Sequence, residues 1–531
     1  MPVTIDGSIQ AFPLTLHRIL DHAAKWHPEV EVVTASESGA NRRVGYASLR
    51  QRARKISRVL SDFGVVVGSR VATLAWNSQA HVEAWYAVMG MGAVCHTLNP
   101  RLTSTQLAWM LGQSGAKILI VSADLLPLAI EVAADASHLE RILVIDADAT
   151  GQGPANVELL TLESLIERTT GDFEWGGFDE CAPSGLCFTS GSTGAPKGVT
   201  YTHRSSFLHT LRLLQADVLG LKSVDTVLPV VPMFHANAWG LPFAVPATGG
   251  KLVLPGRHAD GASLARLIAA EKVTIAVGVP TVWLGLCEHL ETTGAKLPSL
   301  QRIVVGGAPM PPALMERIEK QLGVPVQTSW GMTELSPVGT FGVMSDSVRQ
   351  AAVSGRPALG VDLMLADPNG EPLEQQREQE GRLHVRGAAV IERYFGQQGP
   401  AIGADGWFDT GDLARIDARG NLMITGRAKD LIKSGGEWIN PAEIEAVVCA
   451  LPEVSLAAVI GRNDHKWGER PILLVEMRED HDISDQDLLA SLRGRVASWW
   501  IPDAVVRVPN MPLAATGKID KIRLRATFGG G

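Results

Sequence analysis

The sequence has few of the features that mark secreted or membrane proteins. Only 5 of its 531 residues are cysteine, and none forms a Cys-x-x-Cys pair. This excludes a disulfide framework and indicates core thiols in a reducing compartment. No run of about 18 uncharged apolar residues occurs, so a membrane-spanning helix is excluded. The first residues lack a basic stretch followed by an apolar one, so we expect no signal peptide and a cytoplasmic protein.

An excess of basic charge is also missing. The 48 lysines and arginines are outnumbered by 56 aspartates and glutamates, which gives a formal net charge of -8. A protein whose main task is to hold nucleic acid needs a net basic face, so this class is disfavoured. A stable membrane anchor is disfavoured too, because no basic amphipathic segment is present. Small phosphorylated substrates are compatible with this charge, since they need only local donors.

The first two thirds of the sequence alternates helical and strand patterns. Amphipathic periodicity predicts helices at 14–25, 46–63, 263–271 and 312–322. Short apolar runs predict strands at 71–75, 117–121, 141–145, 226–231, 251–254, 274–279 and 301–305. Such alternation is typical of an α/β fold, in which helices cover both faces of parallel sheets. Ligands of these folds bind at the carboxyl ends of the strands.

The pattern changes after residue 355. Strand patterns at 382–386 and 422–425 indicate a smaller, partly antiparallel unit. The C-terminal part has its own predicted strands and helices, namely strands at 457–460, 471–476 and 504–508 and helices at 441–450 and 485–498. A short polar stretch at 426–430 separates two apolar strands. We therefore predict a boundary there, followed by an α+β domain.

A glycine-rich loop at 188–198, Phe-Thr-Ser-Gly-Ser-Thr-Gly-Ala-Pro-Lys-Gly, is the strongest local signal. Its glycines let the backbone approach a phosphate, its hydroxyls are donors, and Lys197 adds positive charge. It is not the loop of the P-loop NTPases, because Pro196 stands where that motif needs its second glycine. A surface linker is the alternative, but the density of hydroxyls favours phosphate binding.

Five further motifs follow in a fixed order. They are Gly-Gly-Ala-Pro at 306–309, Ser-Trp-Gly-Met-Thr-Glu at 329–334, Trp-Phe-Asp-Thr-Gly-Asp at 407–412, Gly-Arg-Ala-Lys-Asp-Leu-Ile-Lys-Ser-Gly-Gly-Glu at 426–437 and Pro-Leu-Ala-Ala-Thr-Gly-Lys at 512–518. With the glycine-rich loop, this ordered set resembles the adenylate-forming (ANL) superfamily of acyl-CoA synthetases along essentially the whole chain. The segment 232–239, Pro-Met-Phe-His-Ala-Asn-Ala-Trp, resembles the medium- and long-chain fatty acid–CoA ligase branch.

The resemblance implies a domain organisation. A large N-terminal AMP- and acyl-binding domain would cover residues 1–426, with parallel-sheet αβαβα subdomains and a small distorted β-barrel. A hinge at 427–433 would connect it to a small mobile α+β lid domain at 434–531. Lys429 would be the hinge residue, at a position where several relatives carry aspartate.

The resemblance also implies a nucleotide site. Glu334 would ligate Mg²⁺ together with Thr189, and Thr333 would contact phosphate. Asp412 would accept the ribose hydroxyls, and Arg427 would contact the nucleotide. The residues implied to surround the phosphates and the adenine are Thr189, Ser190, Gly191, Ser192, Thr193, Gly194, Lys197, Gly307, Ala308, Pro309, Thr328, Ser329, Trp330 and Gly331.

Catalytic and acyl-binding roles are implied for residues further along the chain. Lys518 would be a mobile lysine that bridges the substrate carboxylate and the α-phosphate as charge builds. His235 would lie beside the carboxylate, and Trp239 would gate an acyl tunnel. The residues implied to lie near the adenylate, or to form a slot for a pantetheine arm, are Lys433, Gly435, Gly436 and Trp438.

Taken one at a time, these residues have plainer interpretations. Thr333 with Glu334 suits a helix start, and Asp412 suits a turn cap. A basic run is usually a solvated face, and a lone histidine beside aromatic residues is usually a core residue. Trp330 stands where the family has tyrosine, and its indole stacks on adenine but lacks a phenol hydroxyl. Trp283 either lines the acyl pocket or packs in a core.

We therefore predict an ATP-dependent carboxylic acid–CoA ligase for a medium- or long-chain fatty acid. It would use ATP, Mg²⁺ and coenzyme A, form an acyl-adenylate, rotate its C-terminal domain and release AMP and pyrophosphate. The expected partners are these small molecules, with no nucleic acid and with a homodimer as the assembly.

Several alternatives stay open. The acid could instead be short-chain, a thioether or an aryl acid. Adenylation for a carrier protein and luciferase-like oxidation are further chemistries of the superfamily. From a different class, the chain could be a non-catalytic adenylate- or fatty acid-binding protein, against which the presence of Lys518, Glu334 and Asp412 argues.

Overall fold

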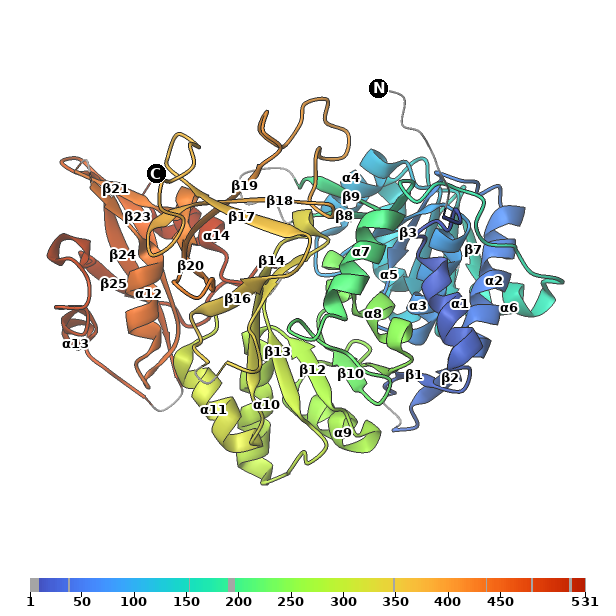
Figure 1. The fold of residues 1–531 in the computed structure, drawn as a ribbon, viewed down its shortest axis with the longest axis horizontal. Coiled ribbons are helices and arrows are strands. Elements are labelled where there is room, and N and C mark those ends of the chain that lie inside the picture. The colour runs from blue at the N-terminus through green and yellow to red at the C-terminus, as the bar shows by residue number, and fades with distance from the viewer. Residues whose placement is uncertain are drawn as a thin grey trace.

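A large N-terminal domain with two sheets and a smaller C-terminal domain with one sheet make up the fold (Figure 1). The computed structural model describes residues 9–36, 39–151, 153–189, 196–346, 349–435, 437–478, 481–514 and 518–530. This architecture confirms the predicted α/β class.

The first sheet has seven strands and is parallel except at one edge. Its order is β7 (Glu158–Thr161), β6 (Arg141–Ile145), β5 (Ile118–Ser122), β3 (Arg70–Leu74), β4 (Val94–Thr97), β8 (Pro183–Phe188) and β9 (Gly198–Thr202), with β9 antiparallel to β8. The helices associated with it are α1 (His17–Trp26), α2 (Tyr46–Asp62), α3 (Gln79–Gly90), α4 (Ser104–Ser114), α5 (Leu126–Asp135) and α6 (Leu162–Arg168), with the short 3₁₀ turn η1 (Ala123–Leu125) before α5. Alternate residues of β5 face opposite cores. Ile118 and Ile120 pack with α2 and α3, whereas Leu119 and Val121 pack with α4 and α5.

The second sheet has thirteen strands in one continuous path. Its order is β17 (Val361–Ala366), β18 (Glu380–Gly387), β19 (Phe408–Ile416), β20 (Leu422–Arg427), β16 (Val353–Pro357), β15 (Val338–Phe341), β14 (Val326–Gly331), β13 (Arg302–Val305), β12 (Ile275–Gly278), β10 (Thr226–Pro229), β11 (Lys251–Leu254), β1 (Glu31–Thr34) and β2 (Arg42–Gly45). The run from β14 to β1 is parallel and the flanks are antiparallel. The antiparallel strands β15–β20 therefore continue this sheet beyond its parallel part.

Several helices and 3₁₀ turns connect or precede the strands of the second sheet along the chain. They are α7 (His203–Leu213), η2 (Ala236–Gly240), α8 (Leu241–Thr248), α9 (Gly261–Glu271), α10 (Pro280–Thr293), α11 (Pro312–Leu322) and η3 (Thr333–Leu335). One core contains apolar residues of α9, α10 and α11 packed against β12–β14. Trp283 is fully buried in this core. This supports the interpretation that Trp283 packs in a core, and not the one in which it lines the acyl pocket.

The C-terminal domain is built on a five-stranded sheet. It contains β22 (Glu437–Ile439), β21 (Ile432–Ser434), β24 (Gly468–Met477), β23 (Val454–Asp464) and β25 (Ala504–Arg507), with η4 (Ala428–Asp430), α12 (Pro441–Cys449), α13 (Asp485–Ala490), η5 (Ser498–Trp500) and α14 (Lys521–Phe528). The predicted helix at 485–498 is wrong beyond Ala490. Leu492 turns into the core there, and Gly494 continues the chain at a φ of 72°, a conformation that glycine adopts without strain.

Every helix within the described ranges is too short or too polar to span a bilayer.

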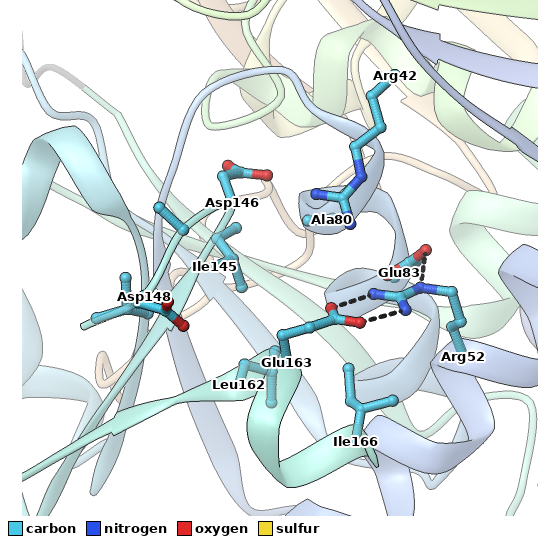
Figure 2. A pocket seen from close by; sticks show the side chains of 12 residues that line it. Arg42, Arg52, Ala80, Glu83, Ile145, Asp146, Asp148, Leu162, Glu163 and Ile166 are labelled. Carbon is cyan, nitrogen blue, oxygen red and sulfur yellow. Dashed lines mark hydrogen bonds and ion pairs between the residues drawn. The ribbon is translucent and has the colours of Figure 1, made fainter.

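A partly buried ion-pair network ties three helices of the N-terminal domain together (Figure 2). It borders a cavity of about 220 Å³. Arg52 on α2 donates to both carboxylate oxygens of Glu163 on α6, at 2.8 and 2.7 Å, and to Glu83 on α3 at 2.8 Å. The Glu83 side chain is only 1% exposed, and its burial raises its pKa while Arg52 opposes that shift.

We expect Arg52→Ala to lower the free energy of unfolding by about 3–5 kcal/mol, because it leaves the Glu83 carboxylate buried without its cation. The urea concentration at half-unfolding measures this loss. Arg58→Ala is the matched control, since Arg58 lies on the same helix in an exposed pair with Asp62 at 3.0 Å. That change should cost no more than about 0.5 kcal/mol. Equal losses in the two variants would show that the ion pairs of Arg52 are not a major support of the fold.

Candidate active site

The two ends of the glycine-rich loop meet at the end of β8. The Thr189 amide donates to the Lys197 carbonyl at 2.8 Å, and the Lys197 amide lies 3.4 Å from Thr189 Oγ1. The predicted donors Ser190, Gly191, Ser192, Thr193 and Gly194 lie outside the described residues. Because β8 belongs to a parallel sheet, its carboxyl end is the edge at which such folds bind ligands.

The carboxylate predicted to ligate a metal lies beside this loop. Thr333 and Glu334 form the 3₁₀ turn that follows β14, and both are buried. The Tyr394 hydroxyl donates to Glu334 Oε1 at 2.9 Å, and the Lys197 ammonium lies 4.8 Å from the Tyr394 ring centre. Burial raises the pKa of Glu334, while Tyr394, Arg427 and Lys197 counteract that rise. The structure therefore brings residues of both N-terminal sheets together.

Asp412 is held by two donors, Arg427 of the neighbouring strand β20 and Trp330 of the more distant strand β14. The Trp330 indole N–H donates to Asp412 Oδ2 at 3.0 Å, and Arg427 Nε lies 2.7 Å from Oδ1. Asp412 is 2% exposed, and burial raises its pKa against the opposing effects of Arg427 and Trp330. Trp330 lacks the phenol hydroxyl of the tyrosine that the family has at this position. Its indole N–H is nevertheless a hydrogen-bond donor, and it donates to Asp412. Trp330 fixes the carboxylate that is predicted to hold a ribose.

The segments predicted to form the adenine wall lie side by side. β13 and β14 are parallel with Val305 opposite Thr328, so Gly307, Ala308 and Pro309 emerge next to Ser329, Trp330 and Gly331. The Ser329 hydroxyl donates to the Val305 carbonyl at 3.1 Å. A Cβ at Gly306 would collide with Ser329 Oγ and lie 3.0 Å from the Trp239 ring. The absence of a side chain at Gly306 thus leaves room for the Ser329 hydroxyl and the Trp239 ring beside this wall.

The charge of Lys518 acts on His235 as well as on Asp412 and Glu334. The Lys518 residue keeps solvent access, yet the protein around its ammonium group and the charge of Arg427 lower its pKa, against Asp412 and Glu334. Burial lowers the pKa of His235 to about 4, and the charge of Lys518 contributes to that shift. His235 is therefore neutral at pH 7, and Lys518 is a cation of the C-terminal domain that acts on the N-terminal site.

The segment between His235 and Gly240 has an unusual backbone. Four consecutive residues, Ala236 to Trp239, have φ values between 45° and 55°, a left-handed conformation that costs about 1–2 kcal/mol per residue. Asn77 holds the preceding segment. Its amide donates to the carbonyls of Pro229 and Val231 at 3.0 and 2.9 Å, and its oxygen accepts the Met233 amide at 2.7 Å. These bonds fix the approach to the turn that carries Trp239.

The predicted residues of the hairpin β21–β22 lie together but not with the others. Lys433 is opposite Trp438, with its ammonium 5.6 Å from the indole, and Gly435 packs against Trp467. In Figure 1, strand β21 lies at the outer end of the C-terminal domain. Lys429 lies in η4, where burial lowers its pKa. Gly436 is outside the described residues.

Three residues with contacts to the site were missed from the sequence. Asn77, Tyr201 and Tyr394 belong to none of the sequence motifs described above, and their partners are distant in the chain. The Tyr201 hydroxyl donates to the Thr333 carbonyl at 3.0 Å. The signal that could have found Tyr394 is the scarcity of tyrosine, since the chain has only 4.

Comparison with known proteins agrees with this geometry. Residues 20–395 match the family model of the AMP-binding enzyme, and residues 443–518 match the AMP-binding enzyme C-terminal domain. The chain is 40% identical to a 3-methylmercaptopropionyl-CoA ligase of Ruegeria lacuscaerulensis, over 98% of both chains. It is 39% identical to a medium-chain fatty acid–CoA ligase of Ectopseudomonas oleovorans, over 98% of this chain and 97% of the relative.

A solved structure shares the whole fold. ATP-bound MatB from Rhodopseudomonas palustris superposes with a TM-score of 0.85 at 26% identity, over 98% of this chain and 99% of that one. The fold and the grouped residues thus define a two-domain enzyme of the adenylate-forming class. The chain belongs to the AMP-binding enzyme family.

Proposed function

We propose that the protein is an AMP-forming acid–CoA ligase with the roles predicted for its site residues. A carboxylate oxygen attacks the α-phosphorus of ATP and pyrophosphate leaves. The CoA thiol then loses its proton and attacks the acyl carbon, and AMP leaves. The observation that carries the proposal is geometric. Tyr394 joins Glu334 to Lys197, Arg427 and Trp330 hold Asp412, and the charge of Lys518 from the C-terminal domain acts on both carboxylates.

Each residue contributes by charge or by position. Asp412 offers carboxylate oxygens to the ribose, and Trp330 offers an indole face to the base. Lys518 supplies a positive charge where the attacking carboxylate and the α-phosphate would otherwise repel each other. His235 is neutral and therefore does not neutralise the substrate carboxylate, which leaves that task to Lys518.

The residues present fit a Mg²⁺ ion carried by the nucleotide. Within the described ranges no group of three or more His, Cys, Asp or Glu side chains could hold a metal alone. Glu334 with the hydroxyls of Thr333 and Thr189 would supply hard oxygen donors, and phosphates and water would complete the shell. When bound, Mg²⁺ supplies charge stabilisation for the leaving pyrophosphate.

The proposed substrate is an aliphatic acid, and a medium- or long-chain fatty acid is the first candidate. The relative from E. oleovorans is named for a medium-chain acid, and one from Thermus thermophilus, 38% identical over 97% of this chain and 96% of its own, is named for a long-chain acid. The second candidate is a short thioether acid, which the name of the 40% identical relative supports. We also propose a homodimer as the assembly.

AMP release with CoA and a panel of acids tests the proposal. The panel holds octanoate, palmitate, 3-(methylthio)propanoate, acetate and benzoate. We expect turnover with at least one aliphatic acid, and the ranking of kcat/KM chooses between the two candidates. Nucleotide binding without AMP release from any acid would support a binding protein and overturn the proposal.

A further inference from the structure

Tyr394 differs from the other tyrosines of the chain. Tyr46, Tyr86 and Tyr201 are at most 2% exposed, and their hydroxyls donate to the backbone carbonyls of Gly250, Pro242 and Thr333 at 2.6, 3.0 and 3.0 Å. Tyr394 is half-buried and donates to a carboxylate, Glu334 Oε1, at 2.9 Å. Three phenols therefore support the backbone, and the fourth holds a charged side chain of the candidate site.

The segment 391–395 touches both parts of the site that would meet the phosphates. The Ile391 amide donates to the Glu334 carbonyl at 2.8 Å, and the Phe395 amide donates to the carbonyl of Gly198, the last residue of the glycine-rich loop, at 2.8 Å. Between these anchors, the Tyr394 ring lies 4.8 Å from the Lys197 ammonium. One side chain thus contacts a cation from one sheet and an anion beside the other.

We propose that Tyr394 is a positioning residue that couples the glycine-rich loop to Glu334. Its hydroxyl restrains one oxygen of the Glu334 carboxylate, and its ring face attracts the Lys197 ammonium. Without Tyr394, the proposed metal ligand Glu334 and the proposed phosphate-binding residue Lys197 lose the side chain that contacts both of them. This inference deepens the proposed function and rests on it, because it presupposes that Glu334 and Lys197 meet the metal and the phosphates of ATP.

Tyr394→Phe tests the hydroxyl while keeping the ring. We measure ATP affinity by calorimetry without acid or CoA, with Mg²⁺ and with EDTA, alongside the Mg²⁺ dependence of ATP–pyrophosphate exchange. The expected result is about tenfold weaker binding with Mg²⁺ and little change with EDTA. Tyr394→Leu removes the ring as well, and should weaken binding in both conditions. Equal weakening by Tyr394→Phe with Mg²⁺ and with EDTA would overturn the proposal.

Two controls separate coupling from loss of structure. Tyr46→Phe removes a buried phenol hydroxyl that donates to the Gly250 carbonyl, so it should lower stability without changing the Mg²⁺ dependence. In a Glu334→Gln background, Tyr394→Phe should have no further effect on affinity with Mg²⁺, and an undiminished effect would contradict coupling through Glu334. Because calorimetry needs no turnover, the result is independent of whether any acid is activated, which is the test of the proposed function.

Discussion

Lys518→Ala is expected to reduce ATP–pyrophosphate exchange by about 10²–10³-fold, while thioester formation from pre-made acyl-adenylate stays within about threefold of wild type. The ammonium of Lys518 acts on Asp412, Glu334 and His235. It is thus placed to offset the charge that develops when a carboxylate attacks the α-phosphorus. The second half-reaction starts from an adenylate in which that bond already exists, so it needs no cation at the same place. Rapid-quench assays of each half-reaction measure the two rates.

The Lys518→Arg variant tests whether the pH dependence of ATP–pyrophosphate exchange comes from the Lys518 ammonium. The pKa of Lys518 is lowered, mainly by the protein around it and by Arg427. Lysine is active as the cation, so exchange should fall as pH rises through this lowered pKa. Arginine stays protonated throughout, and the alkaline decline should move to higher pH even if the maximum rate drops. Equal losses in both half-reactions of Lys518→Ala would contradict a role confined to adenylate formation.

Asp412→Asn is expected to weaken ATP binding by about 100-fold. The carboxylate accepts from Trp330 with one oxygen and pairs with Arg427 through the other. An amide has one acceptor oxygen, so its NH₂ group must face one of these two donors. Arg427 then loses its buried partner, and the ribose loses an anionic acceptor. Calorimetric titration with ATP measures the change.

Trp330→Phe is the matched variant for this site. It keeps an aromatic face for the base but removes the indole donor together with one ring, so we expect about a fivefold loss of ATP affinity, the equivalent of one hydrogen bond of about 1 kcal/mol. The folded fraction of both variants is followed by circular dichroism, since breaking a buried pair also lowers stability. Wild-type ATP affinity in a folded Asp412→Asn variant would show that this carboxylate does not hold the nucleotide.

Most of the architecture could be predicted from local pattern. The strands at 141–145 and 251–254 and the helix at 312–322 have the predicted bounds. Continuous apolar runs mark strands buried on both faces, and they depend on nearby residues alone. The helix beyond Ala490 failed because its periodic apolar residues pack in an irregular turn, which periodicity cannot distinguish from a helix.

The candidate site could be predicted only where its residues lie in recognisable motifs. Asp412 and Glu334 stand in such motifs, but neither the indole that fixes Asp412 nor the phenol that fixes Glu334 could be assigned a partner. Trp330 and Asp412 are 82 positions apart, and Tyr394 and Glu334 are 60 apart. Their contacts depend on strand order across a sheet, which no local spacing encodes.

The sequence by itself determined the α/β class, the order of the motifs and the chemical groups available to a nucleotide. Those properties follow from residue type and periodicity, which act over a few neighbouring residues. Only the tertiary structure decided which charges meet. It brought the charge of Lys518 from the C-terminal domain into electrostatic range of Asp412 and Glu334, and it placed Tyr394 between Lys197 and Glu334. Such pairings arise when separate sheets pack together, because packing, rather than chain order, sets the distances between their side chains.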